Sequence, residues 1–143
     1  MTIRVADILR HKGSRVVSTG RMTTVYDSIA KMVENNVGSI LVTDGDDVCG
    51  IFTERDYLRR IILQGRTSKS TLIEDVMTTE VVWVDPHFDV EECMAIMTKK
   101  KCRHLPVIDE GNVVGVISIG DCVKEISNEA KARTQYLTNY ITG

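Results

Sequence analysis

Aromatic side chains and prolines are scarce in this sequence, and no long apolar run occurs in it. Aromatic residues make up 5% of the chain, and there are 2 prolines. A membrane-spanning helix needs about 18 consecutive apolar residues, a length that no segment approaches. The basic runs also lack the interleaved aromatic side chains that stack on single-stranded nucleic acid. We therefore expect no membrane span, and binding of RNA or single-stranded DNA is a weak hypothesis.

The chain has no excess of charge of one sign. Its 18 basic and 20 acidic residues give a net charge of −2, so no broad field attracts nucleic acid or anionic lipid. The N-terminal segment MTIRVADILRHKG is too polar for a secretory signal, and its Asp7 argues against a transit peptide. We expect a cytoplasmic protein of the bacterial cytosol, or of an organelle matrix if a presequence has been removed.

The 4 cysteines form no recognisable metal or redox motif, so we assign no metal site. No C-x-x-C spacing and no matching histidine pair occurs among Cys49, Cys93, Cys102 and Cys122. Cys49 and Cys93 fall in a predicted strand and a predicted helix, where thiols pack as small apolar groups. Cys102 lies in the basic run KKKCRH, where nearby cations favour a lowered thiol pKa. Buried, reduced thiols suit a reducing compartment.

The sequence contains an internal repeat at a fixed offset of 65 residues. The segment VCGIFTERDYLR, residues 48–59, has an imperfect copy in VVGVISIGDCVK, residues 113–124. Between residues 16–61 and the second copy, eleven positions are identical: Val16, Val17, Val25, Ala30, Met32, Val42, Asp44, Val48, Gly50, Asp56 and Ile61. A repeat of this length without gaps indicates two copies of one supersecondary unit.

Each copy predicts the element order β-α-β-β-α. In the first copy we expect strands at 16–19, 39–43 and 48–52, and helices from Thr24 to about Asn36 and at 54–63. In the second copy the strands are 81–84, 105–108 and 113–119, with helices after Asp89 and from Gly120. Short apolar lead-ins, VADIL and IEDVM, precede the two copies. The sequence thus predicts an α/β (α+β) fold in which two halves share a core, because a three-stranded sheet needs covering.

Both copies place a hydroxyl residue and an aspartate three positions apart where a strand meets a helix. These pairs are Thr53 with Asp56 and Ser118 with Asp121. Such a pair can simply cap the helix, satisfying amide donors of its first turn. It can equally hold a nucleotide, since a helix start attracts phosphate and a carboxylate accepts hydrogen bonds from both ribose hydroxyls. Both readings stay open, and one does not exclude the other.

The duplicated unit resembles a pair of CBS domains, the regulatory repeats named after cystathionine β-synthase. The likeness is carried by GIFTERD (50–56), GVISIGD (115–121), RHLPVID (103–109) and EDVMTTEVVWV (74–84), and it covers the chain from about residue 5 to residue 126. It implies a stand-alone tandem pair, or Bateman module, with pseudo-two-fold symmetry. We expect CBS repeat 1 at 1–66, CBS repeat 2 at 67–127 and a C-terminal helical extension at 128–143.

The resemblance implies adenosine-containing ligands in clefts between the repeats. Asp56 and Asp121 would each bind a ribose diol, and Thr53 and Ser118 would contact phosphate or ribose. The adenine ring would lie against apolar strand residues, and the opposite wall would come from the start of each half. The residues expected there are Ile40, Leu41, Leu105 and Pro106 for adenine, and Thr19, Thr79, Val81 and Val82 for the wall.

The two copies differ in where they carry positive charge. Arg55 lies between hydroxyl and aspartate in the first copy and could pair with a phosphate. The second copy has Ile119-Gly120 there, but carries Arg103 and His104 before its second strand. The structural alternatives are a solvated Arg55 and a basic helix end at Arg103. We expect one cleft to prefer phosphorylated ligands.

The resemblance implies a non-catalytic sensor in signal transduction or energy sensing, which forms a homodimer and regulates an unknown client protein. AMP is the first candidate ligand, with ADP, ATP or NAD as alternatives, and no catalytic cofactor is expected. An enzyme would need an activated nucleophile or a metal cluster, and neither is apparent. The main alternative is a ligand-independent interaction scaffold, or a regulator of a thioredoxin-type enzyme.

Overall fold

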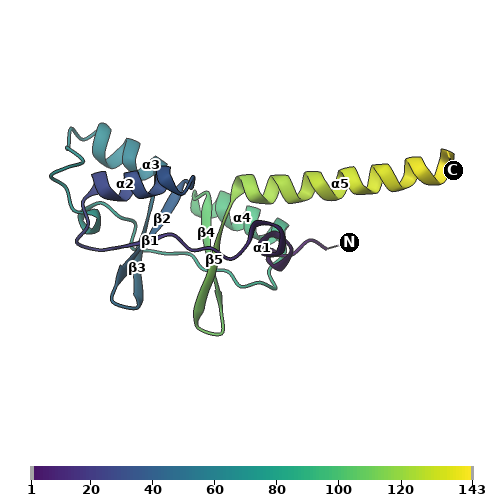
Figure 1. Cartoon of the computed structure of the whole chain (residues 1–143), viewed down its shortest axis with the longest axis horizontal. Coiled ribbons are helices and arrows are strands. Elements are labelled where there is room, and N and C mark those ends of the chain that lie inside the picture. Colours follow the sequence, from purple (N-terminus) through teal and green to yellow (C-terminus); the bar gives the residue numbers. More distant parts are fainter. Residues whose placement is uncertain (1, 143) are drawn as a thin grey trace. The chain divides into compact units, whose positions relative to one another are not determined.

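The computed structural model describes the backbone of residues 2–142 and the side chains of residues 2–139. The chain divides into a first unit, Val16–Val81, and a second unit, which joins Met1–Arg15 to Val82–Gly143. Both units combine helices with a small sheet (Figure 1), so the architecture is the mixed α/β one that the sequence predicts.

The first unit is built on a three-stranded sheet of order β1-β2-β3. Strand β1 (Ser18–Gly20) runs parallel to β2 (Ser39–Asp44), which pairs antiparallel with β3 (Asp47–Thr53). Helix α2 (Val25–Glu34) begins where the sequence predicts, because Oγ1 of Thr24 accepts a hydrogen bond from the Asp27 amide at 3.1 Å. The buried core comprises Val17, Val25, Met32, Ile40, Val42, Phe52, Ile61, Ile73 and Val76.

The helix predicted at 54–63 forms, but most of it is not an α-helix. Helix α3 (Glu54–Asp56) continues into a π-helix, η1 (Tyr57–Ile62), and the amide of Leu63 donates to the carbonyl of Leu58 five residues earlier. The prediction of an ordinary helix was wrong here, because apolar spacing over six residues does not distinguish an α-turn from the wider π-turn.

The second unit has a two-stranded antiparallel sheet, β4 (His104–Asp109) with β5 (Asn112–Ser118). Helix α4 (Val90–Lys100) precedes this hairpin, and helix α5 (Ile119–Thr142) follows it. The buried core comprises Val5, Ile8, Val84, Val90, Cys93, Met97, Leu105, Val107, Ile117 and Cys122.

The strand predicted at 81–84 does not form. Only an isolated parallel bridge joins Val84 to Val107, with the Val84 amide donating to the Pro106 carbonyl at 3.1 Å. Continuing this ladder toward Val82 would require an amide hydrogen on residue 106, which proline lacks. In the first unit the equivalent bond exists, because the amide of Leu41 donates to the carbonyl of Val17.

Each lead-in lies in the unit of the other sequence repeat. Helix α1 (Val5–Lys12) belongs to the second unit, and the short helix η2 (Ile73–Asp75) belongs to the first. Residues 1–15 therefore pack with the segment from Val82 onward, so the compact units and the sequence repeats divide the chain differently.

The lead-ins explain why each repeat carries a glycine in its last strand. A Cβ placed on Gly115 would lie 2.7 Å from Cδ2 of Leu9, and a Cβ on Gly50 would lie 2.5 Å from Sδ of Met77. Real Cβ contacts are longer than this, so a side chain at either position would displace the lead-in side chain that crosses the strand.

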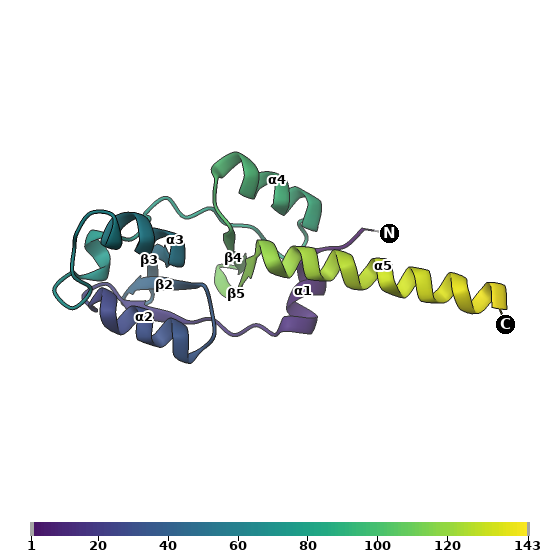
Figure 2. The ribbon, with the colours of Figure 1, turned by 90° about the horizontal axis from the view of Figure 1, so that it is seen from above.

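Helix α5 continues without a break through the predicted C-terminal extension (Figure 2). Its side chains at 131–139 are exposed, among them Tyr136 and Leu137. Residue 143, the last of the predicted extension, lies outside the described residues. Within the described part of the chain, no helix combines the length and the apolar character needed to cross a membrane.

Candidate functional site

Strand β3 ends in Thr53, and the following helix carries Asp56; we call this pair the Asp56 corner. The amide of Asp56 donates to Oγ1 of Thr53 at 3.1 Å, and the amide of Thr53 donates to Oδ2 of Asp56 at 3.0 Å. This reciprocal capping box satisfies two backbone donors at the start of the helix. Because the Asp56 side chain is 15% exposed, its carboxylate is fixed in position and still reaches solvent.

Two further side chains approach the Asp56 carboxylate. Oγ1 of Thr78 lies 3.4 Å from each carboxylate oxygen. Nε of Arg60 lies 4.0 Å from Oδ1, while its Nη1 donates to the carbonyls of Val76 and Met77 at 2.8 Å each. Among the described contacts, the neutral Thr78 hydroxyl therefore approaches the Asp56 carboxylate more closely than Arg60 does, and Arg60 also donates to the backbone.

Strand β5 and helix α5 repeat this geometry in the second unit, at what we call the Asp121 corner. The amide of Asp121 donates to Oγ of Ser118 at 3.0 Å, and the amide of Ser118 donates to Oδ2 of Asp121 at 2.8 Å. His104 lies directly opposite Ser118 across the β4–β5 ladder. The corner thus joins a hydroxyl, a carboxylate and an imidazole-bearing residue within one unit.

Lys12 reaches the Asp121 corner from helix α1. Its Nζ lies 2.6 Å from Oδ2 of Asp121 and donates to the carbonyl of Val116 at 2.7 Å. Burial by itself raises the pKa of Asp121, but the Lys12 ammonium and the Ser118 amide outweigh it, so this pKa lies below its usual value. The carboxylate is therefore ionised and paired over the physiological pH range.

The predicted adenine-binding residues lie in strands. Ile40 and Leu41 belong to β2, Leu105 and Pro106 belong to β4, and all four are buried. Since neighbouring residues of a strand point to opposite faces, only one residue of each pair can face a given side of the sheet.

The predicted residues of the opposite wall lie in the short strand β1 or outside any helix or strand. Thr19, in β1, donates its hydroxyl to Oγ1 of Thr23 at 2.9 Å. Thr79 is exposed, and Val81 and Val82 are half-buried in a segment that forms no strand.

The predicted basic contacts differ in exposure. Arg55 is exposed on α3, Arg103 is exposed just before β4, and the half-buried His104 begins β4. The carbonyl of Arg103 accepts a hydrogen bond from the Ile119 amide at 2.9 Å, which fixes the loop against the start of α5. The contacts of these residues with a ligand stay predictions.

The predicted residues are divided between the units. Those of the first unit are Thr19, Ile40, Leu41, Thr53, Arg55, Asp56, Thr79 and Val81, and those of the second are Val82, Arg103, His104, Leu105, Pro106, Ser118 and Asp121. Sequence reasoning did not find Lys12, Thr78 or Arg60, which contact the two carboxylates. The duplicated lead-in was the available signal, since Lys12 and Thr78 each follow one of its copies.

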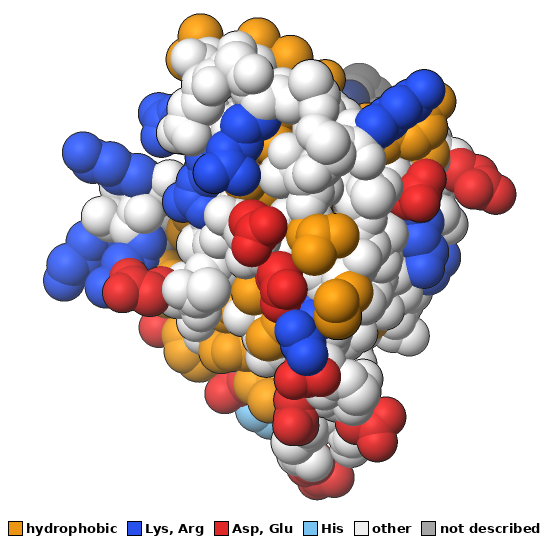
Figure 3. All heavy atoms as spheres, turned by 90° about the vertical axis from the view of Figure 1, so that its left-hand side faces the viewer, with side chains coloured by type: hydrophobic (Ala, Val, Ile, Leu, Met, Phe, Trp, Pro, Cys, Tyr) orange, Lys and Arg blue, Asp and Glu red, His pale blue; other side chains and the backbone are white. Residues whose placement is uncertain are grey.

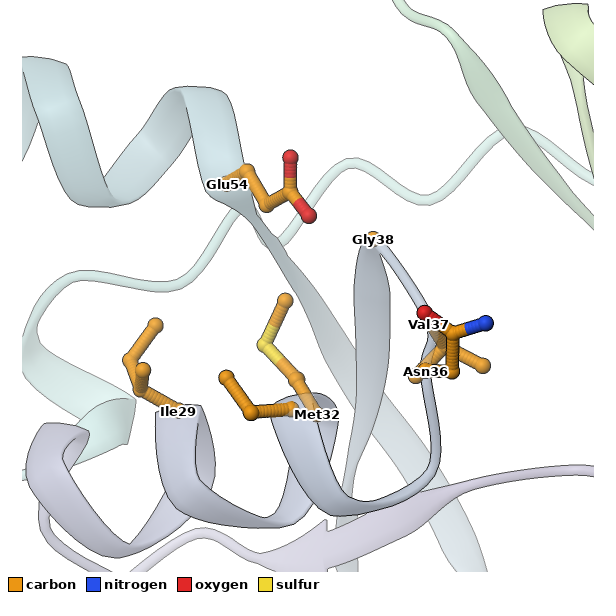
Figure 4. Close-up of a pocket in the computed structure, with 7 residues that line it drawn as sticks. Ile29, Met32, Asn36, Val37, Gly38 and Glu54 are labelled. Atoms are coloured by element: carbon orange, nitrogen blue, oxygen red, sulfur yellow. The ribbon is translucent and has the colours of Figure 1, made fainter.

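Figure 4 shows a pocket in the first unit whose lining includes none of the predicted contact residues, although Glu54 stands next to Thr53 and Arg55 in the chain. It has a volume of about 280 Å³ and is lined by Ile29, Met32, Val33, Asn36, Val37, Gly38 and Glu54. Ligand pockets commonly measure about 300–1,000 Å³, so this hollow is small for a nucleotide. None of its lining residues belongs to either corner.

The cysteine prediction needs one correction. Burial raises the pKa of the Cys102 thiol, whereas its position in a basic run led us to expect a lowered value. The neighbouring cations do not compensate for the loss of solvent around the sulfur. Burial also raises the pKa of Cys93 to about 12 and that of Cys122 to about 11, and all four cysteines are free thiols.

Comparison with known proteins agrees with the duplicated architecture. The family model of the CBS domain matches residues 5–63 and 73–128. The mitochondrial CBS domain-containing protein CBSX3 of Arabidopsis thaliana is 38% identical over 97% of this chain and 72% of its own length. The CBS domain-containing protein YhcV of Bacillus subtilis is 32% identical over 82% of this chain and 84% of its own length.

Solved structures give the same result. A CBS-domain protein from Burkholderia ambifaria has a TM-score of 0.82 at 47% identity, over 86% of this chain and 93% of that one. A CBS domain protein from Pyrobaculum aerophilum complexed with AMP has a TM-score of 0.72 at 24% identity, over 83% and 89% of the two chains, and shares the fold. With two matching domains in one chain, this protein belongs to the CBS-domain family as a tandem pair.

Proposed function

We propose that this chain is a non-catalytic regulatory module that binds adenosine-containing nucleotides at its Asp56 and Asp121 corners. The observation that carries the proposal is the duplication of one geometry, a hydroxyl and a carboxylate held by a reciprocal capping box in both units. A carboxylate held in this way can accept hydrogen bonds from both hydroxyls of a ribose.

Capping and ligand binding are compatible at these corners. The capping amides bond to Oδ2 in both corners, so Oδ1 of each aspartate is less heavily used by the described residues. The hydroxyls of Thr53 and Ser118 accept amide hydrogen bonds and keep their own hydrogens for donation. An oxygen-rich ligand could therefore bind without dismantling the helix start.

AMP is the first ligand to test, followed by ADP, ATP and NAD. The protein from Pyrobaculum aerophilum holds AMP on the same fold, which supports this choice. A ligand present at 100 times its dissociation constant stabilises the folded state by about 2.7 kcal/mol, enough for a clear rise in melting temperature.

The test is thermal unfolding with and without each nucleotide, for the wild type and for Asp56→Ala with Asp121→Ala. We expect the wild type to be stabilised and the double variant to lose that stabilisation. Asp27→Ala is the matched control, because Asp27 occupies the corresponding third helical position after Thr24. If no adenosine compound raises the melting temperature at millimolar concentration, nucleotide binding is not the function.

A ligand-independent scaffold, or a regulator of a thioredoxin-type enzyme, is the second candidate. Its supporting observation is that Asp121 already has an internal cationic partner at 2.6 Å. Under this alternative both carboxylates only stabilise the fold, so AMP would change neither the melting temperature nor the affinity for a purified client protein.

We also propose that the chain forms a homodimer through helices of the first unit. Exposed apolar side chains on α2 and η1 include Tyr26, Val33, Leu58 and Ile62. Figure 3 shows one face of the protein on which apolar side chains are mixed with basic and acidic ones. Light scattering of the wild type and of Val33→Asp with Leu58→Asp tests this; the double variant should be monomeric.

A further inference from the structure

The Lys12 ammonium has one hydrogen to spare at the Asp121 corner. A lysine ammonium carries three donors, and the described contacts use two, one to Oδ2 of Asp121 and one to the carbonyl of Val116. The Lys12 side chain is 39% exposed, so its remaining donor can meet an oxygen that approaches from solvent.

At the Asp56 corner, the cation that the described contacts bring to the carboxylate is more distant, with Nε of Arg60 4.0 Å from Oδ1. The equivalent approach to its carboxylate is made by the neutral hydroxyl of Thr78, and Nη1 of Arg60 is occupied by the carbonyls of Val76 and Met77. The two corners therefore share a hydroxyl and a carboxylate but differ in how closely a cation approaches the carboxylate, 2.6 Å for Lys12 and 4.0 Å for Arg60.

Charge decides what a carboxylate corner can accept. A phosphate monoester carries a charge of about −1.5 to −2 at neutral pH, so an unpaired carboxylate repels it. An ammonium within hydrogen-bond distance cancels the carboxylate charge and adds a charged donor, which is stronger than a neutral one.

We propose that Lys12 is the specificity-determining residue of the Asp121 corner, making it select phosphorylated adenosine ligands over adenosine itself. The inference rests on the proposed function, since it assumes that an adenosine ligand binds there. Lys12 stays paired with Asp121 and presents its third donor to a phosphate oxygen. The Asp56 corner, where Arg60 is 4.0 Å from the carboxylate and donates to backbone carbonyls, discriminates less between AMP and adenosine.

Removing the Lys12 charge should leave the fold intact, because other contacts hold α1 in place. Val5 and Ile8 are fully or almost fully buried, and Leu9 packs against Gly115. Nδ1 of His11 also lies 3.0 Å from a carboxylate oxygen of Glu125 on α5.

The experiment is calorimetric titration of AMP and of adenosine into full-length Asp56→Ala protein, which leaves the Asp121 corner as the site under study. In that background, Lys12→Met removes the charge at similar length, and Lys12→Arg restores it. Arg10→Met is the matched control, since Arg10 lies on the same helix and pairs with Asp7.

We expect Lys12→Met to weaken AMP binding by roughly tenfold to a hundredfold, the usual range for losing a charged hydrogen bond. Adenosine binding should stay the same or tighten, so the preference for AMP should collapse. Lys12→Arg should recover most of the preference, and Arg10→Met should bind both ligands like its parent.

Three results would overturn the proposal, and they can be told apart. If Asp56→Ala binds AMP and Lys12→Met keeps the same AMP-to-adenosine preference, Lys12 does not set specificity although the proposed function stands. If Asp56→Ala binds neither ligand while wild type binds AMP, the Asp121 corner is not a nucleotide site and the inference fails with it. If the wild type also binds neither ligand, the proposed function itself is wrong.

Discussion

The side chain of Met77 occupies the space that a Cβ at position 50 would need. Its Sδ lies 2.5 Å from that position, and the backbone carbonyl oxygen of Thr78 lies 2.9 Å from it. At Gly115 the corresponding neighbour is only the far end of the Leu9 side chain, at 2.7 Å. A flexible side chain can rotate away, whereas a backbone carbonyl held in a bridge to Ile51 cannot.

Gly50→Ala should therefore destabilise the protein more than Gly115→Ala. We expect a loss of about 1–3 kcal/mol for Gly50→Ala, as for other overpacked interiors, and less than about 1 kcal/mol for Gly115→Ala. Urea unfolding followed by circular dichroism measures both. Gly20→Ala, whose new Cβ would meet nothing closer than 3.9 Å, is the control. Equal stabilities of the Gly50 and Gly115 variants would contradict the close approach of the Thr78 carbonyl.

The lowered pKa of Asp121 predicts that the protein loses stability in acid. Its pKa in the folded state lies below the value in the unfolded chain, near 3.9, so the folded state binds fewer protons. The contribution to the free energy of unfolding is complete above about pH 4 and disappears as the pH falls through the folded-state pKa.

Urea unfolding from about pH 2.5 to about pH 7 tests this prediction. The free energy of unfolding is measured for the wild type, Asp121→Asn and Lys12→Met. We expect a shallower acid slope for Asp121→Asn, because the titrating group is gone. In Lys12→Met the Asp121 pKa should rise, since the ammonium that lowers it is removed. A wild-type slope identical to that of Asp121→Asn would contradict the Lys12–Asp121 ion pair.

Arg60 should stabilise the first unit, whereas its neighbour Arg59 should not. Nη1 of Arg60 donates to the carbonyls of Val76 and Met77, so it ties the π-helix to the second lead-in. Arg60→Met should cost about 1–3 kcal/mol, the range for losing hydrogen bonds to a charged group.

Arg59→Met is the matched control, because Arg59 lies in the same π-helix with an exposed side chain. Substitutions at exposed positions usually change stability by less than about 0.5 kcal/mol. Urea unfolding measures the loss of stability in both variants. Equal losses would show that the contacts of Arg60 with the lead-in do not stabilise the first unit.

Much of the fold followed from patterns within a few residues of each other. The capping pairs Thr53–Asp56 and Ser118–Asp121 formed where the sequence predicts them, because a hydroxyl three residues before a carboxylate can satisfy local amides. Antiparallel hairpins likewise formed from the strands predicted at 39–43 and 48–52 and from those predicted at 105–108 and 113–119. The repeat then doubled the evidence for each element, and the structural comparisons confirmed the mixed α/β CBS pair.

Local sequence patterns gave wrong predictions where the structure depends on a distant segment or on a missing hydrogen-bond donor. The strand predicted at 81–84 is lost because Pro106 offers no amide to Val82, a deficiency visible only once the two segments are paired. The π-helix at Tyr57–Ile62 and the raised pKa of Cys102 also depend on surroundings that apolar spacing and nearby charge do not describe.

The sequence by itself determined the duplicated unit, its helices and hairpins, and the paired hydroxyl and carboxylate at each strand-to-helix corner. Only the tertiary structure decided which lead-in crosses which glycine and which side chain reaches each carboxylate. Lys12 and Asp121 are 109 positions apart, and no local periodicity relates them. Their contact arises because α1 buries its apolar face in the core of the second unit, and burying apolar surface brings together residues that the sequence keeps far apart.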